Sequence, residues 1–276
     1  MSELVRYEAG EELATITLDS PHNRNALSAQ LVDELSARLR EAGADQGVRA
    51  VVLTHTGRVF CSGADLAAAA EGPGQSNTAA GGPGKSNTAG SGSLGDAGTA
   101  ILAVLELIVE LPKPVIARIA GHVRAGGMGI VGACDLAIAA EGASFAFTEA
   151  RIGLAPAMIS LTTLDIMDPR QAARYYLTGE TFGASVATRL GLITAACTSE
   201  ELDGVVGGLV AQVRETSPQG AAETKNLLTA ARRQRLAAHG PEMAALSARL
   251  FGSDEAQGHI RAFLDKRAVR PGPAGR

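Results

Sequence analysis

Seven glycines lie between Gly121 and Gly153, and their placement restricts the fold of this chain more than any other feature of the sequence. They follow an apolar run at 114–120 that predicts a buried strand, and a helix is predicted to start at residue 126. Because only 3% of the 276 residues are aromatic, the core must be built from Ala, Val, Leu and Ile with backbones in close contact. The cluster therefore predicts a tight strand-to-helix turn whose backbone N–H groups are not shielded by side chains.

Strands and helices are predicted to alternate along the chain. The predicted strands are residues 5–8, 13–18, 50–54, 114–120, 136–139 and 144–147. The predicted helices are residues 28–42, 100–111, 170–177, 185–190, 202–215, 218–238, 241–251 and 254–267, with Pro241 separating two of them. This order indicates an α/β core followed by a helical C-terminal region.

A second glycine cluster has a different character. Nine glycines between Gly72 and Gly98 lie in a polar segment that contains the near-repeat GPGQSNTA and GPGKSNTA. Residues 71–98 are predicted to form a flexible loop, because they cannot bury enough apolar surface to offset the entropy of ordering. Residues 79–86 (AAGGPGKS) nearly match a phosphate-binding P-loop. Ala79 replaces the first glycine of that motif and no buried strand precedes it, so a nucleotide site is not predicted.

Charge and cysteine content exclude several classes of protein. The net charge of −4 and the pI of about 5.8 predict no nucleic-acid partner and no binding to an anionic membrane surface. No apolar segment is long enough to predict a signal peptide or a membrane span, and we expect a cytoplasmic location. Three separated cysteines, and histidines without metal-ligand spacing, predict neither a disulfide framework nor a metal site.

The sequence contains a second turn of the kind predicted at 121–129. Residues 60–66 (FCSGADL) follow the strand predicted at 50–54, where Gly63 permits a tight bend and Asp65 can accept backbone hydrogen bonds. Either turn alone is an ordinary structural feature, but the two in this order, about 60 residues apart, are specific. Together they predict a site at which backbone N–H groups bind an oxyanion.

With these two turns, the chain resembles the crotonase family, the enoyl-CoA hydratase/isomerase superfamily. The segments that carry the resemblance are PHNRNALS at 21–28, FCSGADL at 60–66, LPKPVIARIAGHVRAGGMGIVGACDLAIAA at 111–140, ASFAFTEARIGLAP at 143–156, LTGETF and ATRLGLI within 177–193, and GHIRAFLDKR at 258–267. The resemblance implies an α/β fold with a crotonase-type ββα spiral core at 1–195, interrupted by the loop at 71–98. It also implies a helical C-terminal trimerisation region at 196–276.

The resemblance implies a ligand and an assembly as well. Members of the family bind acyl-CoA thioesters, so coenzyme A is part of the substrate and no separate cofactor is implied. A homotrimer or a dimer of trimers is implied, with no nucleic-acid partner and no membrane partner.

The resemblance further implies a set of site residues. The N–H groups that stabilise an enolate oxyanion fall on Ala64 and Gly126, and the general acid/base falls on Glu149. The position of a second glutamate, present in many hydratases of the family, falls on Gly129, so the predicted site keeps one carboxylate. The residues implied to contact substrate or coenzyme A are Arg24, Ala26, Cys61, Gly63, Asp65, Leu66, Gly127 and Lys266.

Several reactions remain open on this scaffold. One is hydration of the 2,3 double bond of an acyl-CoA thioester. Three features together resemble the single-glutamate, methylglutaconyl-CoA hydratase-like branch of bacteria, which acts in leucine and branched acyl degradation. They are EARIGLAPAMIS at 149–160, AARYYLTGETF at 172–182 and Gly129. One carboxylate is also sufficient to move a double bond, which makes a Δ3-Δ2 enoyl-CoA isomerase an alternative. The absence of one glutamate also leaves open a non-catalytic acyl-CoA-binding paralogue.

Overall fold

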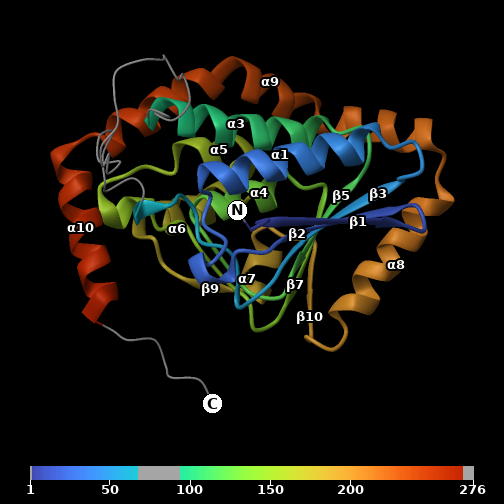
Figure 1. Cartoon of the computed structure of the whole chain (residues 1–276), viewed down its shortest axis with the longest axis horizontal. Coiled ribbons are helices and arrows are strands. Elements are labelled where there is room, and N and C mark those ends of the chain that lie inside the picture. The colour runs from blue at the N-terminus through green and yellow to red at the C-terminus, as the bar shows by residue number, and fades with distance from the viewer. Residues whose placement is uncertain (1, 68–93, 270–276) are drawn as a thin grey trace, which may run out of the picture.

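The computed structural model describes residues 2–67 and 94–269, which fold into an α/β arrangement around two sheets (Figure 1). The larger sheet has six strands in the order β1 (Val5–Gly10), β2 (Leu13–Leu18), β3 (Ala50–His55), β5 (Val115–Ile119), β7 (Leu136–Ala140) and β10 (Ala195–Cys197). Only the β1–β2 pair of this sheet is antiparallel. The predicted α/β class is therefore confirmed.

The smaller sheet positions the functional turns. It consists of β4 (Val59–Cys61), β6 (His122–Arg124), β8 (Ser144–Ala146) and β9 (Phe182–Gly183). Strands β4, β6 and β8 are parallel, and each directly follows a strand of the larger sheet along the chain. Since the carboxyl ends of parallel strands meet at one edge, the segments that follow these three strands gather on one side of the sheet.

The helices complete the repeating ββα pattern and the C-terminal region. They are α1 (Ala29–Ala44), α3 (Leu94–Glu110), α4 (Gly126–Ala133), α5 (Ala157–Thr163), α6 (Pro169–Thr178), α7 (Ala184–Arg189), α8 (Leu202–Glu215), α9 (Pro218–Phe251) and α10 (Asp254–Val269), with 3-10 turns η1 (Pro21–Asn23) and η2 (Glu149–Ile152). Helix α1 begins where predicted, because the Ser28 hydroxyl accepts a hydrogen bond from the Leu31 N–H at 3.3 Å. None of the described helices is both long and apolar enough to cross a membrane.

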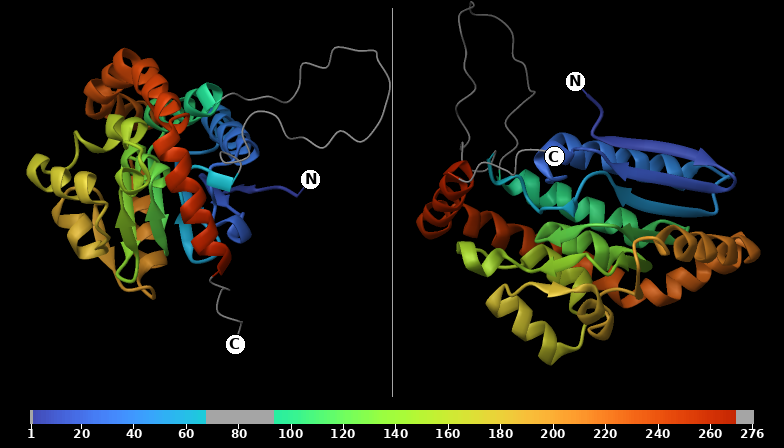
Figure 2. Two further views of the ribbon diagram at one scale, coloured as in Figure 1. Left: turned by 90° about the vertical axis from the view of Figure 1, so that its left-hand side faces the viewer. Right: turned by 90° about the horizontal axis from the view of Figure 1, so that it is seen from below.

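The larger sheet has helices on both faces. Helices α1, α3 and α9 lie over one face and enclose the main core with it (Figure 1). Helix α8 lies on the other face, where Val206 and Val210 pack against Val52 and Ile116. Figures 1 and 2 place α8 and α10 at opposite ends of the molecule. Alternate residues of one strand serve the two faces, since Val51 and Leu53 belong to the main core while Val52 faces α8.

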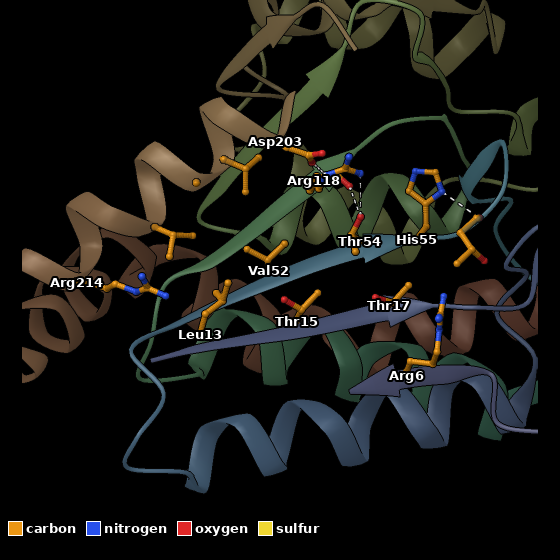
Figure 3. A pocket seen from close by; sticks show the side chains of 14 residues that line it. Arg6, Leu13, Thr15, Thr17, Val52, Thr54, His55, Arg118, Asp203 and Arg214 are labelled. Atoms are coloured by element: carbon orange, nitrogen blue, oxygen red, sulfur yellow. Dashed lines mark hydrogen bonds and ion pairs between the residues drawn. The ribbon is translucent and has the colours of Figure 1, made fainter. Parts of the chain in front are cut away.

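The hollow between α8 and the outer face of the larger sheet is separate from the predicted site (Figure 3). It has a volume of about 520 Å³, and Thr15 and Thr54 point into it from neighbouring strands. Arg118 crosses from β5 to α8, where its Nε lies 2.6 Å from Asp203 Oδ1. None of the predicted site residues lines this hollow.

Helix α9 differs from the sequence prediction. The sequence predicts two helices, at 218–238 and 241–251, but α9 is continuous through Pro241. Its buried positions form one stripe on both sides of the proline: Lys225, Thr229, Arg232, Leu236, Gly240 and Ala244. Proline removes one backbone hydrogen bond from a helix, and packing of this uninterrupted stripe outweighs that loss.

Short strands also differ from the prediction. The sequence predicts turns at 60–66 and 121–129, but the structure extends β4 to Cys61 and forms β6 at 122–124 before each turn begins. Strands of three residues contain too few positions to show a period of two, so their pairing partners rather than their own pattern define them.

Candidate active site

The segments that follow β4, β6 and β8 line a cavity of about 1150 Å³, together with residues of η1, α5, α9 and α10. The predicted site residues that line it are Arg24, Ala26, Ala64, Asp65, Leu66, Gly126 and Glu149. Four parts of the sequence that are far apart are thus brought to one cavity. The side chain of Lys266, on α10, lies outside the described residues.

The two glycine turns are in direct contact. Gly63 has φ +89°, and a Cβ at this position would lie 2.6 Å from the Ala125 Cβ and 3.1 Å from the Gly126 nitrogen. Only glycine fits such a backbone conformation at this closeness. The Gly63 carbonyl accepts a hydrogen bond from the Leu27 N–H at 2.8 Å, which fixes the turn against the segment that follows η1.

The N–H groups of Ala64 and Gly126 are available to a ligand. Within the described residues neither of them donates to a protein acceptor, and both residues line the cavity. Gly126 is the first residue of α4, so the positive end of the helix dipole lies at the same place. The preceding Ala125 has φ +46°, a conformation that a non-glycine residue rarely adopts and that often marks a functional site.

Cys61 and Gly127 lie behind the wall of the cavity. A Cβ on Gly127 would be 2.8 Å from the Cys61 Cβ, so β4 and α4 touch here. Cys61 is fully buried, and burial raises the pKa of its thiol to about 12. A thiol that stays protonated is a poor nucleophile, so Cys61 supports the wall rather than the chemistry. Gly63 and these two residues do not line the cavity themselves.

Glu149 is the buried acid of the cavity. It begins η2, directly after the segment that follows β8, and is 9% exposed. Its Oε2 atom is buried and has no hydrogen-bond partner within the described residues. Burial raises the pKa of this carboxyl to about 7, and a hydrogen bond to its own backbone N–H opposes the shift. Such a group can both accept and donate a proton near neutral pH.

Asp65 is the other acidic residue among the described residues that line the cavity. Its carboxylate accepts hydrogen bonds from Asn23 Nδ2 at 3.0 Å and from the Ala67 N–H at 3.2 Å. The side chain therefore joins η1 to the turn that follows β4. These are turn hydrogen bonds of the kind that the sequence predicts for Asp65, and its contact with substrate or coenzyme A stays a prediction.

Two basic residues of the cavity, both in the predicted second turn, lie outside the predicted set of site residues. His122 and Arg124 on β6 both line it, because alternate residues of a strand face the same side. The Ser144 hydroxyl lies 2.9 Å from His122 Nδ1 and accepts a hydrogen bond from Arg124 at 2.8 Å. Their spacing of two residues is the sequence signal for a shared strand face, but the sequence predicts a turn over 121–129.

Helix α10 covers the cavity of its own chain. Ala256 and Ile260 of this helix are fully buried against Leu154, next to η2. The residues of α10 that line the cavity are His259, Ala262, Phe263 and Leu264. Figure 2 shows α10 (red) crossing the molecule in front of the sheets. The sequence predicted the helix, but its docking surface is a tertiary feature.

Comparisons with known proteins agree with this arrangement. A family model described as enoyl-CoA hydratase/isomerase matches residues 8–270. The chain is 32% identical over 271 residues to a Thermus thermophilus protein provisionally named as an enoyl-CoA hydratase, covering 97% of this chain and 100% of the relative. It is also 30% identical over 210 residues to 4-chlorobenzoyl coenzyme A dehalogenase-2 of an Arthrobacter species, covering 76% and 71% of the two chains.

Solved structures give the same result. A crystal structure of an enoyl-CoA hydratase from Mycobacterium avium is 47% identical and superimposes with a TM-score of 0.81, covering 96% of this chain and 98% of that one. Similarity at this level over nearly the whole length establishes the shared spiral architecture. The relatives carry names of more than one reaction, so the reaction of this chain has to be argued from its own site.

Proposed function

The chain belongs to the enoyl-CoA hydratase/isomerase family, and from this premise we propose that it is an enoyl-CoA hydratase that adds water across the 2,3 double bond of an acyl-CoA thioester. The observation that carries the proposal is the buried, unpartnered Oε2 atom of Glu149 in the cavity that the Ala64 and Gly126 amides also line. A desolvated carboxyl beside two unused N–H donors suits a reaction that moves a proton and creates an oxyanion.

Glu149 is the proposed general base and acid. Its carboxylate takes a proton from water while the oxygen of that water bonds to C3, and the electrons of the double bond move to the thioester oxygen. The amides of Ala64 and Gly126 hold the resulting oxyanion. Glu149 then returns the proton to C2, which regenerates the thioester carbonyl. The two donors are already placed before the reaction, which is the main advantage of backbone groups in this role.

Arg24 is the proposed contact for the phosphates of coenzyme A. It is exposed at the mouth of the cavity and has φ +55°. The turn is held by the buried neighbouring residue Asn25, whose Oδ1 accepts from the Ser20 N–H at 2.7 Å and whose Nδ2 donates to the Val59 carbonyl at 2.8 Å. Ala26, Leu66 and Lys266 are proposed to contact the rest of the coenzyme A moiety.

A Δ3-Δ2 enoyl-CoA isomerase is the second candidate. The observation that favours it is the glycine at position 129, which leaves Glu149 as the buried carboxyl among the described cavity residues. One carboxyl is sufficient to remove a proton from C2 and return it at C4. A branched acyl substrate, such as one from leucine degradation, remains part of the proposal.

The assembly is proposed to be a homotrimer or a dimer of trimers in the cytoplasm. Two adjacent apolar side chains of α9, Leu227 and Leu228, are 80% and 76% exposed in the single chain. A neighbouring copy would remove this apolar surface from water.

The test is an assay with purified protein on crotonyl-CoA, on methylglutaconyl-CoA and on a 3-enoyl-CoA. Hydration is followed by the loss of the conjugated enoyl thioester absorbance. Glu149→Gln keeps the shape of the side chain and is expected to lower kcat by about 100-fold or more. A Glu149→Gln enzyme as active as the wild type would disprove the role of Glu149. Binding of these esters without turnover of any would disprove the enzymatic proposal.

A further inference from the structure

Ile159 separates position 129 from the active-site cavity. A Cβ added to Gly129 would lie 2.7 Å from Ile159 Cγ2, 3.1 Å from its Cβ and 3.3 Å from its Cα. Ile159 lines the cavity, whereas Gly129 is buried and does not. A side chain growing from residue 129 would therefore meet Ile159 before it reached the cavity.

Close packing of α4 against α5 explains the glycine. A Cβ on Gly132, one turn after Gly129 on α4, would lie 2.7 Å from the Thr162 carbonyl oxygen of α5. The Thr162 hydroxyl donates a hydrogen bond to the Gly129 carbonyl at 2.9 Å. The two helices are thus in close contact at Gly129 and at Gly132. A carboxyl at position 129 would need a different residue at position 159 as well.

The cavity wall formed by the residues that follow Glu149 along the chain offers few polar side chains to which a water molecule could hydrogen-bond. The cavity residues of this wall are Arg151, Ile152, Leu154, Ala155, Pro156, Ala157, Met158 and Ile159. The charged one, Arg151, donates its Nε–H to the Thr178 carbonyl at 2.8 Å. An ordered water needs two to four polar partners. None of these wall residues carries a carboxylate, so a water held by Glu149 Oε2 finds no second carboxylate on the Ile159 side.

We propose that Ile159 restricts the site to a single catalytic carboxyl, because its side chain fills the space through which a second carboxyl from position 129 would act. Ile159 thereby sets the ratio of hydration to double-bond migration. This inference rests on the proposed function and names the feature that selects between its two reactions. Ile159 acts by shape and does not itself transfer a proton.

Double-bond migration needs only groups that the site contains. Glu149 removes a proton from C2 of a 3-enoyl thioester, and the electron pair moves onto the thioester oxygen beside the Ala64 and Gly126 amides. The same carboxyl returns the proton to C4. The C3–C4 double bond becomes a C2–C3 double bond, and no water or other reactant enters. Hydration, by contrast, requires a water to be held and oriented, which a second carboxylate would assist.

The experiment compares kcat/KM for hydration of crotonyl-CoA with kcat/KM for migration in 3-hexenoyl-CoA. The variants are Ile159→Ala, Ile159→Gly, Gly129→Glu and Gly129→Glu/Ile159→Gly. Ile159→Ala opens space for water in the wall of the cavity that Glu149 also lines, and it is expected to raise hydration relative to migration several-fold. The double variant, which adds the carboxyl, is expected to raise this ratio about tenfold or more. Gly129→Glu alone is expected to raise it little, because Ile159 still blocks the path.

Thermal unfolding supplies a second measurement that does not depend on activity. Gly129→Glu is expected to lower the Tm much more when Ile159 is present than when it is glycine, which is a direct coupling between the two positions. Equal losses of Tm in the two backgrounds would overturn the proposed obstruction. An unchanged ratio in both Ile159→Ala and the folded double variant would overturn the proposed control of the reaction.

The two proposals fail in different ways. A wild-type chain that hydrates crotonyl-CoA but moves no double bond overturns the inference and leaves the hydratase proposal intact. A wild-type chain that acts on neither ester overturns the proposed function, and the Tm coupling then decides whether Ile159 excludes the second carboxyl.

Discussion

Lys225 Nζ lies 2.7 Å from Asp135 Oδ2, and the two side chains are only 4% and 15% exposed. The ammonium also donates to the carbonyls of Ile108 at 2.8 Å and Lys113 at 3.1 Å, and the same carboxylate oxygen accepts from the Val115 N–H at 2.7 Å. This network attaches α9 to the end of α3 and to strand β5.

Removal of one partner is therefore expected to be costly. Lys225→Met leaves Asp135 buried without its cation, which is expected to lower the free energy of unfolding by about 3–5 kcal/mol. Asp135→Asn/Lys225→Met removes both charges and keeps an oxygen for the Val115 N–H, so it should lose less than the two single variants added together. Urea unfolding of the four proteins measures this. Additive losses would show that the two charges do not interact.

The pH dependence of catalysis follows from Glu149. Burial raises the pKa of this carboxyl to about 7, and the carboxylate form is the one that accepts a proton from water. The kcat/KM for hydration is therefore expected to rise with pH and to reach half of its maximum near pH 7. Assays from about pH 5 to about pH 9, in buffers that do not affect the enzyme, check this because they extend roughly two pH units on each side of that pKa. An inflection near 4.5, the ordinary value for glutamate, would show that Glu149 is not desolvated in the working enzyme.

The same burial makes Glu149 a source of instability at high pH. The folded chain holds the proton with a pKa of about 7 while the ordinary value is 4.5, so the folded state binds more protons between these values and stability falls as pH rises through this window. The difference corresponds to about 3 kcal/mol. Glu149→Gln is expected to be more stable than the wild type at pH 8 and to lose this advantage near pH 4. Thermal unfolding at both pH values measures it, and an equal difference at the two would contradict the assignment.

The glycine turns were predictable because their chemistry is local. FCSGADL and RAGG each start in the last residues of a strand and continue into a turn, and the positive φ of Gly63 is what a tight bend of this kind requires. Glu149 was found by its place in a segment that resembles the family. These features depend on a few neighbouring residues, so one sequence is sufficient to recognise them.

Features that depend on distant packing were not predictable. In the sequence, Ile159 is an ordinary apolar residue. The structure packs α5 against α4, and the position of Ile159 then explains why residue 129 is glycine. Pro241 has the local signature of a helix end, but packing along α9 continues across it. His122 and Arg124 face the cavity because β6 pairs with β4 and β8, which a three-residue segment does not reveal.

Assembly is tested on the exposed leucines of α9. If Leu227 and Leu228 lie in a subunit interface, Leu227→Asp/Leu228→Asp should place two charges in it and shift the protein from oligomer to monomer in light scattering. Val205→Asp on α8, where the native side chain is 36% exposed, is the matched control and should leave the mass unchanged. Dissociation by the control instead of the α9 variant would place the interface on the α8 side.

Gly63 tests the contact between the two turns. Gly63→Ala would put a methyl group 2.6 Å from the Ala125 Cβ in a backbone with φ +89°, so the turns must separate and the Ala64 and Gly126 amides lose their common geometry. Loss of one oxyanion donor costs about 10²–10³ in kcat, and a loss of that size is expected here. Gly142→Ala is the matched control, because a Cβ there has nothing within 4 Å. Steady-state kinetics on crotonyl-CoA, with circular dichroism to show that both variants fold, measure the effect. A folded Gly63→Ala enzyme with the wild-type kcat would exclude the paired amides as the oxyanion site.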